Sequence, residues 1–159
     1  MTESHRMPGV RRAGVADLPL VAPLFDAYRV FCKQPSDVAA AHAFLTERLR
    51  LNESVILLAE LGDGVAAGFT QLYPAFTSVG IRRLWYLNEW YLNDMYVAPE
   101  ARRRGVSTAL LEAARQHGLA TGAARLVLTT ELDNLAAQAT YEAHGWKRDE
   151  RYYTYELPL

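Results

Sequence analysis

Residues 94–107 read D-M-Y-V-A-P-E-A-R-R-R-G-V-S. The apolar start predicts a strand that ends at Pro99, and the apolar spacing after Gly105 predicts a helix over 106–119. The basic turn therefore precedes a helix N-terminus, where backbone N–H groups lack partners and the helix dipole is positive. Gly105 lets a ligand approach the backbone, and three arginines add charge. The turn predicts a site for pyrophosphate or a similar anion. The alternative is a basic helix start on the surface, which the three arginines disfavour because they oppose the helix dipole.

Upstream of this turn the sequence predicts a short strand, two helices and three strands. The first helix is expected to begin at the cap Asp17 and the second at Ser36. The predicted elements are a strand over 10–13, helices over 18–28 and 36–49, a strand over 54–61, a hairpin turn over 62–64, a strand over 65–73, a loop over 74–83 and a long strand over 84–97. Within that last strand, Y-L-N-E at 86–89 is echoed by Y-L-N-D at 91–94. The five-residue spacing of the echo indicates a bulge or a local extension.

Downstream the sequence predicts a turn at 121–122, a strand over 125–130 and a helix over 134–144 that Gly145 closes. One or two aromatic strands are expected over 146–157. This order of elements predicts an α/β (α+β) fold, with a mixed sheet that carries helices on its faces. We expect one domain over 1–159, with residues 1–8 flexible.

Composition narrows the class of protein. Half of the 159 residues are apolar, 22% are charged and the formal net charge is −1, which is typical of a soluble globular domain and favours neither nucleic acid nor a membrane surface as partner. The one cysteine, Cys32, excludes a disulfide within the chain, and no histidine pair has metal-ligand spacing, so we expect no metal. The polar N-terminus lacks the apolar run of a signal peptide, so we expect the cytoplasm.

Two motifs resemble those of the GCN5-related N-acetyltransferases (GNAT). Their signature is Arg or Gln, two residues, Gly, one residue, then Gly or Ala, which residues 102–107 match as R-R-R-G-V-S. Ser107 departs from the last position; serine is small, so we expect the loop to be retained and the affinity to be affected. The second motif, N-x-x-A-x-x-x-Y-x-x-x-G-aromatic, is matched by Asn134, Ala137, Tyr141 and 145–146. The resemblance spans residues 54–157.

The resemblance implies a single mixed, mostly antiparallel central sheet flanked by helices, and acetyl-CoA as the acetyl donor. It implies that the backbone around Met95 and Val97 pairs with the pantetheine arm, that Asn134 binds the arm or the acetyl end, and that Tyr141 is the general acid. Asn134 could instead be only a helix cap, and Tyr141 only a packed core residue. The full set of coenzyme A contacts expected is Met95, Tyr96, Val97, Arg102, Arg103, Arg104, Gly105, Val106, Ser107, Thr108, Asn134, Ala137 and Tyr141.

The expected activity is transfer of acetyl to a primary amine of a small molecule. An alkylammonium has a pKa near 10, so a base must take its proton. The candidates are Asp94, Glu89 or a water, whereas Asn93, where related small-amine enzymes carry Glu, cannot be a base. The residues expected at the acceptor are Tyr28, Gln71, Tyr73 and Asn93. The alternatives are acetylation of protein N-termini or lysines, and a non-catalytic module that senses acetyl-CoA. An apolar strand edge over 152–157 predicts a homodimer.

Overall fold

The computed structural model describes residues 8–62, 64–89 and 92–159, and for 88–89 and 92–93 it describes the backbone alone. The chain forms two compact units, Met1–Thr129 and Thr130–Leu159, and each is described by itself. The prediction of one domain stays a prediction, and the expected flexible segment lies outside the described residues, except for Pro8. No helix of the described residues combines the length and the apolar character needed to cross a membrane.

The first unit is built on a mixed, mostly antiparallel sheet, as predicted. Five of its strands follow the order β1 (Gly9–Arg12), β2 (Val55–Leu61), β3 (Val65–Thr77), β4 (Arg82–Tyr86) and β8 (Leu126–Val127). A sixth strand, β7 (Met95–Val97), pairs with β3 antiparallel. The pairing of β4 with β8 is parallel, and the other pairings in this sheet are antiparallel. The long strand β3 therefore carries β7 along its first half and β4 along its second.

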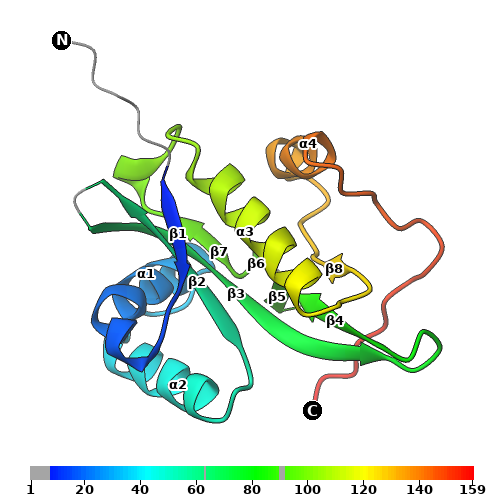
Figure 1. Ribbon diagram of the computed structural model, residues 1–159, viewed down its shortest axis with the longest axis horizontal. Helices are drawn as coiled ribbons and strands as arrows, with labels where there is room; N and C mark the ends of the chain where they lie inside the picture. The colour runs from blue at the N-terminus through cyan, green and yellow to red at the C-terminus, as the bar shows by residue number, and fades with distance from the viewer. Residues whose placement is uncertain (1–7, 63, 90–91) are drawn as a thin grey trace. The chain divides into compact units, whose positions relative to one another are not determined.

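Helices cover both faces of this sheet (Figure 1). On one face lie α1 (Leu18–Phe31) and α2 (Val38–Arg50), which share a buried apolar cluster with Ile56, Leu58 and Phe69. On the other face lies α3 (Val106–Ala120), close to the predicted helix, with Val106, Leu110, Leu111 and Ala114 buried. Two 3-10 turns, Val15–Asp17 and Pro99–Ala101, precede α1 and α3. Asp17 occupies the N-cap position of α1 as predicted, but its carboxylate accepts from the Gly14 N–H and from Arg11 and makes no capping bond to the helix.

The predicted strand over 84–97 is interrupted. Strand β4 ends at Tyr86, and the short strands β5 (Asn88–Glu89) and β6 (Leu92–Asn93) pair with each other. Strand β7 then pairs with β3, as β4 does. The Asp94 N–H donates to the Leu87 carbonyl at 2.8 Å and closes the base of this excursion. Residues 88–89 and 92–93 thus form a small separate sheet between β4 and β7, which confirms the predicted local extension.

The predicted loop over 74–83 is wrong, because β3 continues to Thr77 and β4 begins at Arg82. Proline lacks an N–H and is tolerated in a strand only where that donor has no partner. The Gln71 N–H donates to Asp94 on the β7 side of β3. Pro74 lies three residues on, so its nitrogen faces the opposite edge, and β2 no longer pairs there because Leu72 is already opposite Val55. Pro74 therefore costs the sheet no hydrogen bond.

In the second unit, the predicted helix is confirmed as α4 (Leu135–Ala143), and Gly145 follows it with a φ of 86°. The predicted strands over 146–157 are wrong, since none of these residues is in a strand. A strand is stabilised by a neighbouring ladder and by burial of one face. The described residues supply neither, because the side chains of Tyr152, Tyr153 and Tyr155 are all exposed. The strand predicted over 125–130 is also short, with only β8 formed.

Candidate active site

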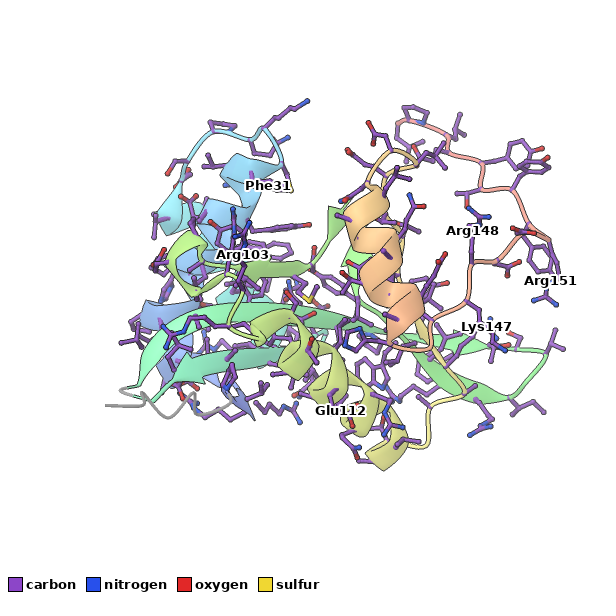
Figure 2. The ribbon with its side chains drawn as sticks, turned by 90° about the horizontal axis from the view of Figure 1, so that it is seen from above. Phe31, Arg103, Glu112, Lys147, Arg148 and Arg151 are labelled. Atoms are coloured by element: carbon purple, nitrogen blue, oxygen red, sulfur yellow. The ribbon has the colours of Figure 1, made fainter. Side chains whose placement is uncertain are left out.

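The turn between β7 and α3 presents backbone donors. Arg103 and Gly105 both have left-handed backbone angles, with φ of 61° and 76°, and these two residues reverse the chain before α3. Gly105 is the N-cap and makes no side-chain capping bond, while the Ala109 N–H makes the first helical bond back to the Gly105 carbonyl. The N–H groups of 106–108 therefore lack helical acceptors. The predicted anion site therefore has three backbone donors at its helix end, and Figure 2 shows Arg103 on the turn.

Charge on this turn comes from three consecutive side chains. Arg102, Arg103 and Arg104 are all exposed. Arg102 also lies back along β7, where its Nε donates to the Val97 carbonyl at 3.4 Å. Ser107, the departure from the family signature, is half-buried at the start of α3, and Thr108 is exposed. The turn is thus a positively charged surface with unpaired backbone donors at its centre, suited to a phosphate group.

Gly68 on β3 lets three backbone segments meet at this turn. A Cβ on Gly68 would lie 2.5 Å from the Tyr96 carbonyl oxygen, 3.3 Å from the Val97 Cα and 3.2 Å from a Val106 methyl. Glycine is therefore required for β3, β7 and the first residue of α3 to pack together. Sequence reasoning missed Gly68, although an isolated glycine within a strand pattern signals close backbone approach.

The outer edge of β7 is the second feature that the resemblance predicted. The Asp94 carbonyl accepts from Gln71 and the Ala98 N–H donates to Ala67, so alternate residues of β7 face β3. The N–H and C=O groups of Met95 and Val97 therefore point to the other edge. No strand of the described part of the chain pairs with β7 along that edge. An extended ligand with amide groups could pair there as another strand would. Tyr96 instead packs its ring against the α1 and α2 cluster.

A buried polar cluster surrounds Asp94 on the α1 side of the sheet. The Tyr28 hydroxyl donates to one Asp94 carboxylate oxygen at 2.9 Å, and the Gln71 side-chain amide donates to the other at 3.3 Å. The same amide nitrogen donates to the Tyr73 hydroxyl at 2.8 Å, and the amide oxygen accepts from the Ser54 hydroxyl at 2.8 Å. The structure thus brings together Asp94 and three of the four residues predicted for the acceptor, and it adds Ser54.

Burial and charge set the protonation of this cluster. Asp94 is 3% exposed and Gln71 is fully buried. Burial and the neighbouring Asp94 carboxylate raise the pKa of Tyr28 well above its ordinary value, so its hydroxyl stays a donor at neutral pH. The backbones of Glu89 and Asn93 lie in the small sheet of β5 and β6, but their side chains lie outside the described residues.

In the second unit, both motif residues of α4 have defined settings. Asn134 caps the helix, with its side-chain oxygen accepting from the Ala137 N–H at 3.2 Å, and this bond leaves the amide N–H groups of Asn134 unused. Tyr141 is 6% exposed and its ring meets Trp146 edge to face. Burial raises the pKa of Tyr141 to about 12, which keeps the phenol protonated at neutral pH.

Comparison with known proteins defines the family. The chain matches the Acetyltransferase (GNAT) family over residues 21–146. It is 43% identical to an uncharacterized N-acetyltransferase, YhfO, of Bacillus subtilis (strain 168), over 93% of this chain and 95% of that protein. It is 32% identical to a probable acetyltransferase of Haemophilus influenzae, over 90% and 92% of the two chains. The crystal structure of a probable acetyltransferase superposes with a TM-score of 0.87 at 40% identity, over 95% and 97%. The chain therefore belongs to the GNAT family and is an N-acetyltransferase.

Proposed function

We propose that this enzyme transfers an acetyl group from acetyl-CoA to a primary amine of a small molecule. The observation that carries the proposal is the combination of a positively charged turn rich in backbone donors with a strand edge that no described strand covers. The turn offers the N–H groups of 106–108 and three arginines, and β7 offers the backbone of Met95 and Val97 beside it. A pyrophosphate joined to an amide-containing arm has both of the groups that such a surface binds.

The described residues fit coenzyme A at this place. Gly105 takes a left-handed conformation that ordinary residues adopt at a cost, and a Cβ there would meet no protein atom within 4 Å. Open space beside the turn leaves room for a phosphate to approach the backbone. Acetyl-CoA, when bound, supplies an acetyl thioester. The acid, the base and the amine-binding groups then come from the chain.

The Asp94 cluster is the proposed acceptor side. Asp94 is held by two neutral donors, Tyr28 and Gln71, so its carboxylate is oriented for a cationic ammonium. In the reaction, the ammonium must lose a proton before its nitrogen attacks the thioester carbon. Asp94 is the proposed recipient of that proton, with Glu89 or a water as the alternatives that the sequence leaves open.

Tyr141 is the proposed general acid. Breaking the carbon–sulfur bond places negative charge on sulfur, and a phenol could supply the proton that neutralises it. This role rests on the match of residues 134–146 to the family motif. Burial raises the pKa of Tyr141 to about 12, so the phenol carries its proton at neutral pH but is a weaker acid than a free tyrosine. Asn134, whose amide N–H groups are not used by the capping bond, is the proposed ligand of the arm or the acetyl end.

Two proteins of the same fold show the range of acceptors. AAC(6')-Iy has been solved in complex with the bisubstrate analog CoA-S-monomethyl-acetylneamine, and it superposes with a TM-score of 0.74 at 22% identity. A ribosomal-protein-alanine N-acetyltransferase from Brucella melitensis superposes equally well, at 20% identity. At these identities the likeness shows the fold alone. The burial of Asp94, Gln71 and Tyr28 favours a small acceptor, because a peptide backbone needs an open groove.

One turnover experiment tests the proposal. The protein is mixed with acetyl-CoA and, separately, a panel of small amines and a panel of peptides with free N-termini or lysines, and the release of free thiol is followed. Turnover with a small amine is expected. Turnover with peptides alone would select the protein acetyltransferase, and coenzyme A binding without turnover would select the sensing module. The homodimer and the cytoplasmic location stay predictions; a monomer by light scattering at tens of micromolar protein would remove the first.

A further inference from the structure

We propose that Ser54 and Gln71 are positioning residues that hold Asp94 and Tyr73 in register for the acceptor amine. This inference rests on the proposed function. The sequence pattern gave no reason to single out Ser54, and it placed Gln71 in direct contact with the acceptor. The geometry assigns Gln71 a different task, since its side chain is fully buried and its amide is already bonded at both ends.

The hydrogen bonds of Gln71 form a directed chain. The Ser54 hydroxyl donates to the amide oxygen, and the amide nitrogen donates onward to the Tyr73 hydroxyl and the Asp94 carboxylate. Both amide N–H groups are thereby used, because a glutamine amide has two. The Gln71 backbone N–H also donates to the Asp94 carbonyl at 2.8 Å, so the two residues are tied through main chain and side chain together.

The orientation of the Gln71 amide decides whether this chain of hydrogen bonds can form. The two ends of a glutamine amide have nearly the same shape, so packing alone does not select one of them. Turned over, the Gln71 amide would set its oxygen 3.3 Å from an Asp94 carboxylate oxygen, and two acceptors would face each other. The Asp94 carboxylate, which only accepts, therefore selects the orientation with the amide nitrogen toward it. Ser54 lies immediately before β2 and is 2% exposed, and its hydroxyl donates to the amide oxygen, so that the buried amide is held at both ends.

The proposed consequence is functional rather than structural. With Gln71 fixed, one Asp94 oxygen is held from the β3 side and the other is held by Tyr28 from α1. Loss of the Ser54 hydroxyl would take this donor from the buried Gln71 amide oxygen, so the amide would be held less firmly and its bond to Asp94 would weaken. Acetyl-CoA binding would not change, because the turn and the β7 edge contain neither residue.

The test is a double-mutant cycle with steady-state kinetics. Ser54→Ala is expected to lower kcat/KM for the amine about 5- to 20-fold, the scale of one or two lost hydrogen bonds, with KM for acetyl-CoA unchanged within about twofold. In a Gln71→Met background the same Ser54→Ala change should cost less than about twofold, because its route through Gln71 is gone. Equal losses in both backgrounds would overturn the proposal, as would a Ser54→Ala enzyme with wild-type kcat/KM.

The matched control is Thr70→Val. Thr70 is adjacent to Gln71 and equally buried, and its hydroxyl bonds to no described residue. It should leave kcat/KM for the amine within about twofold, so an effect as large as that of Ser54→Ala would show that any hydroxyl lost from this core disturbs the site.

A second measurement needs neither a variant nor turnover. By NMR, the side-chain amide protons of Gln71 in the wild-type protein should exchange with solvent at least tenfold more slowly than those of the exposed Gln34. Equal exchange rates would refute the fixed amide even if the Ser54→Ala protein failed to fold. If no amine is acetylated, the proposed function fails, and this measurement still decides whether the Gln71 amide is fixed in place.

Discussion

Gly68→Ala should damage the proposed coenzyme A surface, although Gly68 is not among the residues proposed to contact the ligand. The added Cβ would lie 2.5 Å from the Tyr96 carbonyl oxygen, a distance that real Cβ atoms do not reach. The oxygen belongs to the backbone and has no rotamer that removes it, so β7 must move away from β3. Overpacking of a core costs about 1–3 kcal/mol, and a clash with backbone places this variant at about 3 kcal/mol. At roughly 2–4 °C per kcal/mol for a chain of this size, the melting temperature should fall by about 6–12 °C.

Two other glycines make this prediction specific. A Cβ on Gly9 meets no atom within 4 Å and Gly9 has no positive φ, so Gly9→Ala should change stability by less than about 0.5 kcal/mol. Gly105→Ala also meets no atom but must hold a φ of 76°, which costs about 1–2 kcal/mol. The assays are thermal melting and calorimetric titration with coenzyme A. Gly68→Ala should weaken binding at least tenfold, because Val97 and Val106 shift together. A melting temperature within 2 °C of wild type, with equal affinity, would refute the packing argument.

Three further predictions concern Tyr141 and Thr70. Tyr141→Phe should lower kcat about 10²-fold with coenzyme A affinity retained, the lower end of general-acid effects; a rate within about twofold of wild type by steady-state kinetics would reject the acid role. Because burial raises the pKa of Tyr141 to about 12 from 10.0, the unfolded chain releases this proton first as pH rises. The contribution of Tyr141 to the free energy of unfolding should therefore be constant below pH 10 and decline between pH 10 and 12. In urea titrations, the Tyr141→Phe protein should lose less unfolding free energy over this pH range than the wild-type protein does. Thr70→Val removes a buried hydroxyl that bonds to no described residue, so melting should show a stability equal to wild type or higher by up to about 1 kcal/mol, whereas a loss of 2 kcal/mol would reveal a partner.

The sequence predicted those parts of the fold and site that depend on neighbours in the chain. The turn at Gly105, the cap Asn134 and the excursion within 84–97 follow from local patterns of turn residues, helix caps and repeated spacing. The predictions were wrong where the structure of a segment depends on a strand that is distant in the sequence. Pro74 suggests a loop, because the sequence does not show that β2 ends before it could pair with the Pro74 nitrogen. Residues 146–157 alternate like a strand, but no described strand pairs with them.

The residues of the candidate site also divide into those that the sequence indicates and those that only the fold brings in. Tyr28, Gln71, Tyr73 and Asp94 could be proposed from residue type, but Ser54 enters only because β2 and β3 pair in a register that sets it beside Gln71. The turn of a regular hairpin sets the register of its strands, but the β2–β3 register shifts between Ala59 and Glu60, and the sequence did not predict that shift. Gly68 is different, because a glycine inside an apolar strand pattern is visible in the sequence and indicates a close approach.

Strand β3 explains how one sheet can serve two ligands independently. Side chains alternate between faces along a strand, so Phe69 and Gln71 point toward α1 while Gly68 and Thr70 point toward α3. The first face holds Asp94, the proposed contact of the amine, and the second packs against the helix whose N-terminus is the proposed pyrophosphate site. Substitutions at Gln71 should therefore change the kinetics of the amine, and substitutions at Gly68 the affinity for coenzyme A. The two faces share the backbone of β3. A shift of β3 large enough to move both faces would therefore appear as loss of folding, and not as a change in the kinetics of the amine or in the affinity for coenzyme A alone.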